Sequence, residues 1–494
     1  MLQAAVQAVN PETAIRRHVR VEYNELIVVN NPSNEQQRAA TTKTEKGQSC
    51  PNSNHYLYNL DQYDRIVIIA FGKASSSMAA TLAQLLDSVA DKVSGICITK
   101  DGHATAAERK ILQRYNVRLY EAAHPVPDER SVQASQHVLQ YLQHTASEKT
   151  LVLTCISGGG SALCCAPTPP LTLQDLQSTN QALLSAGWSI DQMNILRKRL
   201  DGVKGGRLAA AAGESTVVSF ILSDVVGDPL DLIASGPTVP DTSTWETAWA
   251  LVQQQQSANE GSGGASAALV LPEAVQQLLQ DGVDGKIPDS PPPTHPAFAK
   301  AKHVLVGNTA QAVHSAAATA QALGYHPVVL ATQLQGEAKE LANIFVAMAQ
   351  QLQQETLPFG MKLPAAILTG GESTVTFETS GKGGRNQEMG LAVALGLDKL
   401  HLSSPVVFAS LGTDGTDGPT DAAGALVDGN TVAHLGRDAA MKALQQHNAY
   451  PFLQQVTPDG TSPLLKTGAT GTNVADVQIL LIGKHSSTIQ EETN

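Results

Sequence analysis

Residues 65–86 read RIVIIAFGKASSSMAATLAQLL and decide the fold class of the chain. The uninterrupted apolar run Ile66–Phe71 is typical of a buried parallel strand, and Gly72 ends it. The residues after it fit a helix, so Lys73 is predicted to lie at a strand-to-helix turn. Ligands of α/β folds bind at this edge of the sheet, which makes Lys73 a candidate cation for an anion. A lysine on a surface turn is the competing interpretation.

The alternation of short apolar strands with helical patterns continues through the chain. It predicts βαβ units, and therefore an α/β fold with two α/β domains, of which the N-terminal one is Rossmann-like with a mainly parallel sheet. Polar and proline-rich composition places the boundary near residue 240, giving domains of 1–240 and 241–494. Residues 2–22 are expected to be helical, 30–60 to form a polar insert, and 257–265 to be flexible.

Bulk properties exclude several classes of function. A chain of 494 residues is too long for one ordinary core. Its net charge is −12 with no basic block, which argues against nucleic acid as a partner. No apolar run approaches the ~18 residues that span a bilayer, and no signal peptide is recognisable. The five cysteines form no CxxC pair, which favours a reducing compartment. We therefore expect a cytoplasmic protein without a membrane partner, either a monomer or a homodimer.

A second glycine turn follows another buried strand. The segment SGGGS comprises Ser157, Gly158, Gly159, Gly160 and Ser161. Three glycines between a strand and a helix let the main chain approach phosphate oxygens without Cβ clashes. The pattern is neither GxGxxG nor a Walker A sequence. A tight turn is the alternative, but we favour an anion or nucleotide site.

Charged residues gather at two further places in the first half. The densest cationic segment runs from Arg197 to Arg207 and includes Lys204. It fits either a solvated helix face or a ligand-facing loop, because glycines interrupt its helical pattern. Asp224 follows the strand Val217–Leu222. A carboxylate there is a candidate metal ligand or general base, although aspartate also caps loops and helices.

The stretch from Thr369 to Gly424 carries cations and carboxylates on glycine loops. Lys382 and Arg385 lie in a glycine-rich turn, and Asp414, Asp417 and Asp421 lie in a second loop after a strand. Separate strands are predicted from Ala365 and from Thr374. Cations with nearby carboxylates on glycine loops favour phosphoryl chemistry.

Other site types fit the sequence poorly. The aspartate spacing is not that of an EF-hand, whose twelfth position, counted from Asp414, is Ala425. No HExxH or paired histidine ligands indicate zinc. Ser161 lacks a GxSxG context, and no GxGxxG follows the first strand, so a serine hydrolase and a nicotinamide enzyme are disfavoured. Mg²⁺ held together with substrate phosphates needs only one or two carboxylates.

Six segments together resemble the class II glycerate kinases. They are GKAS at 72–75, SGGGSAL at 157–163, RKRLDGVKGGRLA at 197–209, SDVVGDPLDLIASGPT at 223–238, GKGGRNQE at 381–388 and GTDGTDGPTDAAGALVD at 412–428. The resemblance extends from about residue 4 to residue 484. Many relatives have a longer GKGRGGR turn before the residue that matches Arg385, and the Cys164–Cys165 pair is unusual.

The resemblance implies ATP-dependent phosphorylation of D-glycerate with Mg²⁺, in a cleft between an N-terminal domain and a C-terminal domain whose MOFRL-type region spans about 365–485. Lys73 and Arg385 match active-site cations of the family, Asp224 joins them as a catalytic candidate, and Arg197 and Lys204 are candidates for binding glycerate. Asp224, Asp414 and Asp417 are candidate magnesium ligands. The candidate ATP-binding residues are Ser157, Gly158, Gly159, Gly160, Ser161, Asn308, Gly371, Glu372 and Thr413.

Three alternatives stay open on the sequence. The 2-hydroxyl of glycerate is favoured as phosphoryl acceptor, with the 3-hydroxyl possible. A non-catalytic sugar-acid or nucleotide-binding protein would share the fold. A hydroxyacid dehydrogenase is the third reading, disfavoured by the missing dinucleotide fingerprint.

Overall fold

The computed structural model describes residues 1–30, 55–261, 269–354, 361–376, 381–400, 402–457 and 461–484. The chain forms two compact units, and each is described by itself. One unit contains residues 11–306, and the other contains residues 1–10 together with 307–494. The division therefore falls after Val306, whereas composition placed a boundary near residue 240.

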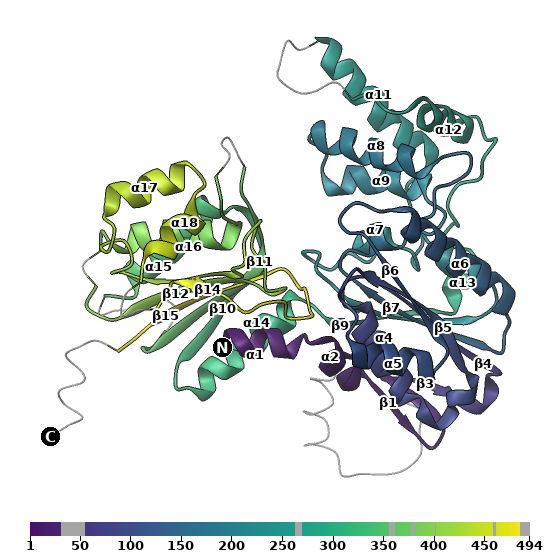
Figure 1. Cartoon of the computed structure of the whole chain (residues 1–494), viewed down its shortest axis with the longest axis horizontal. Coiled ribbons are helices and arrows are strands. Elements are labelled where there is room, and N and C mark those ends of the chain that lie inside the picture. The colour runs from purple at the N-terminus through teal and green to yellow at the C-terminus, as the bar shows by residue number, and fades with distance from the viewer. Residues whose placement is uncertain are drawn as a thin grey trace. The chain divides into compact units, whose positions relative to one another are not determined.

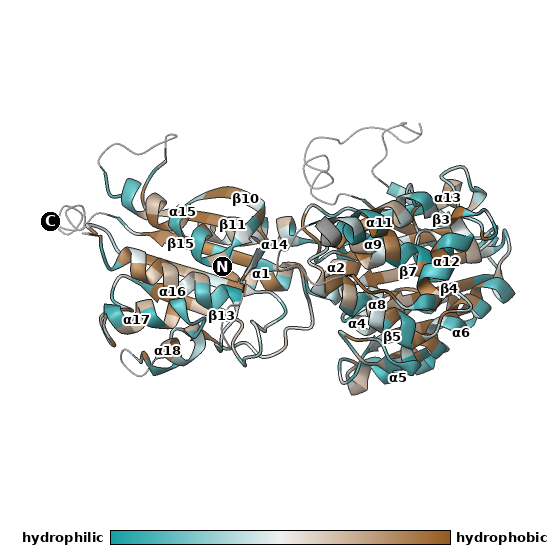
Figure 2. Cartoon of the chain, turned by 90° about the horizontal axis from the view of Figure 1, so that it is seen from above, coloured by the Kyte–Doolittle hydropathy of each residue, from teal (hydrophilic) through white to brown (hydrophobic). Residues whose placement is uncertain are grey.

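The first unit is built around a six-stranded sheet in the order β6-β5-β4-β7-β8-β9 (Figure 1). Its pairs from β6 to β8 are parallel, with β4 and β7 at the centre. Every residue of β7 is buried, as expected of a strand covered on both faces. Figure 2 shows these strands as apolar and the outer helix faces as polar. The strands are β4 (Arg65–Phe71), β5 (Val93–Lys100), β6 (Val117–Ala122), β7 (Thr150–Ser157), β8 (Thr216–Leu222) and β9 (Ala301–Gly307).

Helices precede or connect these strands. They are α2 (Pro11–His18), α4 (Ser75–Leu85), α5 (Ala106–Arg114), α6 (Glu129–Thr145), α7 (Gly160–Leu163), α10 (Arg207–Ala211) and α13 (Pro296–Ala299), with 3₁₀ turns at Leu60–Gln62, Asp87–Lys92 and Ile233–Ser235. An antiparallel sheet is added by β1 (Val19–Glu22), β2 (Glu25–Val29) and β3 (His55–Asn59). The helical region expected over 2–22, with a break at Pro11, thus ends at His18. Most of the predicted polar insert, residues 31–54, lies outside the described residues.

A helical cluster with its own apolar core explains why the boundary differs from the prediction. It contains α8 (Leu173–Ser185), α9 (Ile190–Leu200), α11 (Trp245–Gly261) and α12 (Glu273–Val283). Trp245 and Val252 of α11 share a core with Leu196 and Leu200 of α9. Residues after 240 therefore complete the first unit. Helix α11 also runs to Gly261, into the segment that was expected to be flexible.

The second unit has a mixed six-stranded sheet in the order β10-β11-β15-β12-β13-β14. Only the β10–β11 pair is parallel among the pairs described. The strands are β10 (His326–Glu337), β11 (Ala365–Thr374), β12 (Val406–Gly412), β13 (Gly424–Asp428), β14 (Leu464–Leu465) and β15 (Asp476–Ile482). Strand β11 runs through Thr374, so no separate strand begins at that residue, and positions 377–379 of the predicted strand lie outside the described residues.

Helices cover both faces of this second sheet (Figure 1). On one side lie α15 (Ala338–Gln351), α16 (Arg385–Leu397), α17 (Arg437–Gln445) and α18 (Ala449–Gln455). On the other lie α14 (Thr309–Ala322) and α1 (Leu2–Ala8). Residues 1–10 are attached by side-chain hydrogen bonds, from Ser315 Oγ to Ala4 O at 3.1 Å and from Thr472 Oγ1 to Val9 O at 2.6 Å.

Two further features of the described residues bear on the sequence predictions. No helix in these ranges has both the length and the apolar character required to cross a membrane. Four cysteines, Cys97, Cys155, Cys164 and Cys165, are buried and form no disulfide with one another. Burial is the main cause that raises the pKa of each of these thiols, which makes them poor nucleophiles.

Candidate active site

The two glycine turns of the first unit are joined at the carboxyl edge of its sheet. The Lys73 N–H donates to Gly158 O at 2.9 Å, and the Ala74 N–H donates to Ser157 Oγ at 3.1 Å. Gly72 has φ +123°, and a Cβ there would clash with Ser157. Because β4 and β7 are neighbours in the sheet, the turns that follow them meet. The structure thus brings Lys73 and the SGGGS loop together, as the two strand-end positions predicted.

Gly159 lies where two side chains close on the loop. Its φ is +81°, and a Cβ on it would lie 2.9 Å from the His124 ring and 3.3 Å from Lys73 Cγ. His124 follows β6, and His103 Nδ1 lies 3.1 Å from Lys73 O. Burial, then the charges of Lys73, Lys100 and His103, lower the pKa of His124 to about 4. The His124 ring is therefore neutral at physiological pH.

Asp224 lies against the same loop at Gly158. It follows β8, the strand next to β7 in the sheet. A Cβ on Gly158 would clash with Asp224 Oδ2, so glycine is required for the carboxylate to approach the loop main chain. Lys73, the glycine loop and Asp224 therefore form one cluster.

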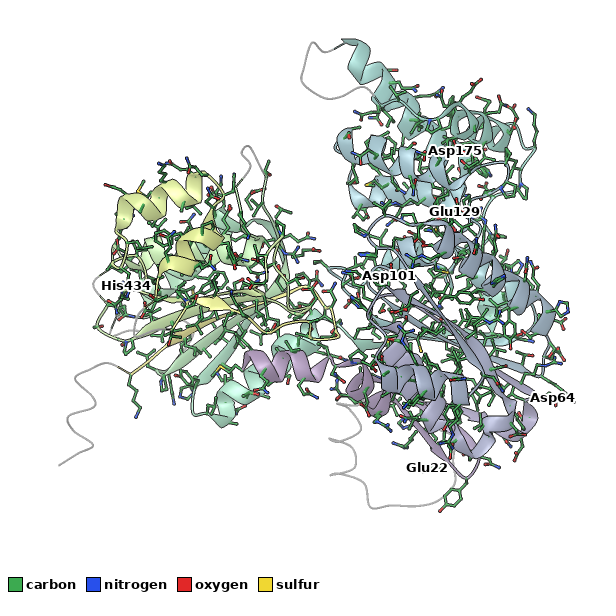
Figure 3. The ribbon with its side chains drawn as sticks, viewed as in Figure 1. Glu22, Asp64, Asp101, Glu129, Asp175 and His434 are labelled. Atoms are coloured by element: carbon green, nitrogen blue, oxygen red, sulfur yellow. The ribbon has the colours of Figure 1, made fainter. Side chains whose placement is uncertain are left out.

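A cavity of about 820 Å³ opens beside the loop within the first unit. Gly159, Ser161 and His124 line one part of it, and helix α8 lines another. Figure 3 labels Asp175 on α8 and Glu129 at the start of α6. The Asp175 carboxylate accepts from the Thr172 N–H at 2.8 Å and so fixes the beginning of α8. Arg197, Asp201 and Lys204 complete the charged lining.

The cationic segment from Arg197 to Arg207 is not a solvent-exposed helix face, and most of its cations are not available to bind a ligand. Lys198 pairs with Asp231 at 3.2 Å, and the buried Arg199 pairs with Asp289 at 2.6 Å. Lys204 is buried against Asp201. Most of the positive charge of the segment is therefore neutralised inside the protein.

Two arginines of that segment have no carboxylate partner in the described part of the chain. Arg207 donates to the carbonyl oxygens of Lys198 and Lys204 and does not line the cavity. Arg197 does line it. Its Nε donates to Asn180 Oδ1 at 2.8 Å, and no carboxylate pairs with it in the described part of the chain. Since it also lines the cavity, its guanidinium presents positive charge there. Of the two candidate glycerate-binding cations, Arg197 keeps an unneutralised charge and Lys204 does not.

In the second unit, Arg385 begins α16 and is held by two carboxylates. Its Nε and Nη2 donate to the two oxygens of Asp476 at 2.6 and 2.9 Å, and its Nη1 lies 2.9 Å from Glu372 Oε1. Asp476 is completely buried. Sequence reasoning missed Asp476, although an aspartate directly before the apolar run of β15 was a visible signal.

The three aspartates of the second loop have separate roles. Asp417 accepts from the main-chain N–H groups of Asn386 and Gln387 at 3.1 and 2.8 Å, and so caps α16. Asp421 pairs with Lys466 at 2.9 Å. Asp414 Oδ1 accepts from the Thr416 N–H at 2.9 Å within its own turn. They do not converge on one point, and no group of three potential ligands for a metal occurs among the described residues.

The other ATP-binding candidates of this unit are partly occupied by structural bonds. Asn308 caps α14 through the Gln311 N–H at 3.0 Å. Thr413 is buried, and its Oγ1 donates to Ala475 O at 2.6 Å. Gly371, at φ +152°, permits close pairing with Leu334 of β10. Within this set, Glu372 forms an ion pair with the candidate catalytic arginine.

Comparison with known proteins defines the class of this chain. The family described as "Domain of unknown function (DUF4147)" matches residues 1–269, and the MOFRL family matches residues 365–476. The crystal structure of glycerate kinase from Thermotoga maritima superposes with a TM-score of 0.74 at 30% identity, covering 97% of each chain. The chain belongs to the class II glycerate kinase family.

Individual relatives carry two kinds of name. The "D-glycerate 2-kinase" of Thermotoga maritima is 35% identical over 85% of this chain and 91% of its own. The "Glycerate kinase" of Danio rerio is 32% identical over 98% of this chain and 96% of its own. A protein of Agrobacterium vitis named "Putative hydroxypyruvate reductase" is 37% identical over 85% of this chain and 100% of its own.

Proposed function

We propose that the protein is an ATP-dependent kinase that converts D-glycerate to 2-phosphoglycerate with Mg²⁺. The observation that carries the proposal is the cluster of Lys73, the SGGGS loop and Asp224 beside a cavity that Arg197 lines. Family membership supports the substrate and the reaction. The names of two relatives, both glycerate 2-kinases, support the 2-hydroxyl as acceptor.

The glycine loop and Lys73 are suited to binding the phosphoryl group that is transferred. Phosphoryl transfer is catalysed mainly by positioning and by neutralising charge on the phosphate oxygens. Main-chain N–H groups of the loop and the Lys73 ammonium supply that charge from a rigid strand edge. Ser161 Oγ, 2.9 Å from Ser235 Oγ, adds a hydroxyl to the lining of the cavity.

Arg197 suits the carboxylate of glycerate. A guanidinium binds carboxylates through parallel N–H donors, and Asn180 fixes the Arg197 side chain through Nε only. Lys204 contributes less, because Asp201 already neutralises it. We retain Arg385 as a second catalytic cation, and a site that draws on both units stays a prediction.

The residues present fit a magnesium ion bound with ATP. Asp224 is the primary candidate ligand because its carboxylate lies against the loop that would hold the phosphates. Asp414 is a second candidate. Asp417 is a poor one, because main-chain donors already use both of its oxygens. When bound, Mg²⁺ would neutralise phosphate charge and orient the transferring group.

The test measures ADP and product directly. Purified protein with ATP, Mg²⁺ and D-glycerate should form ADP in proportion to glycerate, and ³¹P NMR should identify 2-phosphoglycerate. Absence of glycerate-dependent ADP would contradict the proposal and leave a binding protein. A 3-phosphoglycerate signal would correct the acceptor only.

A second assay tests whether the protein has the reductase activity that the name of one relative indicates. Hydroxypyruvate with NADH or NADPH should show no cofactor oxidation, because the first strand-to-helix turn is Gly72-Lys73-Ala74-Ser75 and not a dinucleotide fingerprint. Hydroxypyruvate-dependent oxidation of either cofactor would favour the reductase.

A further inference from the structure

The cavity beside the glycine loop contains few groups able to accept a proton. Its titratable lining residues are His124, Cys165, Arg197, Asp201 and Lys204. Arg197 and Lys204 are proton donors in their charged forms. Cys165 is buried, and burial raises the pKa of its thiol to about 12. These three cannot serve as a base at neutral pH.

Asp201 is fixed by structural contacts. One oxygen accepts from the Val203 and Ala166 N–H groups at 2.9 and 3.3 Å, and the other pairs with Lys204. The carboxylate is also fully buried, at 2% exposure. The carboxylate is therefore held in a buried ion pair with two further donors, and His124 is the remaining proton acceptor among the lining residues.

His124 also lies against the glycine loop, close to the Lys73 side chain. The site that a Gly159 Cβ would occupy lies 2.9 Å from His124 Nε2 and 3.3 Å from Lys73 Cγ. The imidazole thus contacts the loop that we place at the phosphates, on the same side as the Lys73 side chain. In the described part of the chain, neither His124 ring nitrogen has a hydrogen bond.

The surroundings of His124 keep the ring in its accepting form. Lys73 follows β4, and Lys100 and His103 come from the end of β5 and its following turn. These positive or ionisable groups face the ring and oppose its protonation, in addition to burial. The neutral imidazole is available above its pKa of about 4, and acidification below that value removes it by protonation.

We propose that His124 is the catalytic base that takes the proton of the glycerate hydroxyl during phosphoryl transfer. This role rests on the proposed kinase function. The hydroxyl oxygen forms a bond to the γ-phosphorus of ATP while the bond between that phosphorus and the β,γ-bridging oxygen breaks. ADP leaves with the electron pair, and the hydroxyl proton moves to Nε2 of His124. The imidazolium then releases it to solvent.

Three variants test the role of His124. His124→Gln keeps a polar group near the Nε2 position but cannot accept the proton. Its kcat should fall roughly 10²- to 10³-fold while KM for ATP changes less than about threefold. The acidic limb of the kcat pH profile should disappear with it. His137→Gln is the control, because His137 is exposed on α6 and bonds only Tyr120 OH in the described structure.

His124→Ala supplies a readout that a structural role would not move. Added imidazole should restore part of its kcat, and substituted imidazoles should restore it according to their basicity. Circular dichroism checks that each variant is folded. If both folded variants keep kcat within about threefold of the parent, or if His124→Ala is slow and imidazole restores nothing, His124 is not the base.

The outcomes separate this inference from the kinase proposal. If the unmodified protein forms no glycerate-dependent ADP, the proposed function itself fails. If the unmodified protein is active and its pH profile is unchanged by His124→Gln, only the role of His124 is overturned.

Discussion

Lys73 and Arg385, the two candidate catalytic cations, have opposite electrostatic surroundings. Arg385 contacts the fully buried Asp476 and also Glu372. In the described part of the chain Lys73 has no carboxylate partner, and His124 beside it is neutral. One cation is neutralised within its own unit, and the other is left to an external anion.

The difference indicates that Lys73 can bind an anionic ligand directly, whereas Arg385 depends on the two carboxylates that hold it. An unpaired ammonium at a glycine loop can give its full charge to a phosphate. A guanidinium shared with two carboxylates is oriented by them, and much of its charge is already used. We therefore expect substitution of Lys73 to affect chemistry alone, and substitution of Arg385 to affect chemistry and folding together.

The largest effect is expected for Arg385→Ala. It leaves the Asp476 carboxylate buried without its partner, which typically costs about 3–5 kcal/mol of stability. Activity should also fall by orders of magnitude. Thermal and urea unfolding measure the first effect, and ADP release measures the second.

Arg437→Ala is the matched control for Arg385→Ala. Arg437 has the same exposure as Arg385, 32%, but its partner Asp398 is 25% exposed instead of fully buried. Its loss should cost less than about 1 kcal/mol. Equal destabilisation by the two variants would mean that burial of Asp476 is not what distinguishes Arg385.

Lys73→Ala should lower kcat by roughly 10³-fold without measurable loss of stability. The lysine has no ion pair with any described residue that could be lost, whereas the transferring phosphate loses a positive contact. Steady-state kinetics and a thermal melt test both statements, with Lys110→Ala, an exposed lysine on α5, as control. A stability loss comparable to that of Arg385→Ala would remove the contrast between the two cations.

The smallest effect concerns Asp417, which caps α16 beside Arg385. Burial raises the pKa of Asp417 from 3.8 to about 7, although the N–H groups of Gln387 and Asn386 oppose this change. The folded state then binds more protons than the unfolded state between these values, so stability declines as pH rises from about 4 to 7. Each tenfold difference in proton affinity between the folded and unfolded states changes the free energy of unfolding by about 1.4 kcal/mol.

Asp417→Asn removes this titration, so its destabilisation should be greater at pH 5 than at pH 8. Urea unfolding at both pH values measures the difference. A destabilisation that grows with pH would show that the carboxylate is ionised in the folded state and stabilised by its donors. Asp421→Asn serves as control, because Asp421 is exposed and should show no such dependence in this pH range.

The strands nearest the glycine loop could be predicted from the sequence, because the pattern that indicates each strand lies within a few consecutive residues. Strand β4 contains a continuous apolar run, and β7 and β8 are mostly apolar. The residues that could act in catalysis follow them: Lys73, the SGGGS loop and Asp224. Parallel pairing of neighbouring strands then brings those residues to one edge. At Lys73, the SGGGS loop and Asp224, the position predicted from the local sequence pattern is the position in the folded unit.

The predictions that failed or fell short depended on partners distant in sequence. Lys198 and Arg199 look like solvated or ligand-binding cations until Asp231, Asp241 and Asp289 are brought to them. Asp476 lies 91 positions from Arg385 in sequence. The domain boundary was misplaced for the same reason, because helix α11 completes a core begun by α9. Composition alone carries no information on such contacts.

The attachment of residues 1–10 to the second unit has a consequence for protein synthesis. Helix α1 packs on α14, which is encoded some 300 residues later. At about 5–20 residues per second, roughly 15–60 s separate the emergence of these two helices from the ribosome. During that interval Ala5 and Val9, both fully buried in the finished protein, have no α14 to cover them. Strand β9, which completes the first unit, emerges directly before α14, so residues 1–10 stay without their partner throughout the synthesis of that unit.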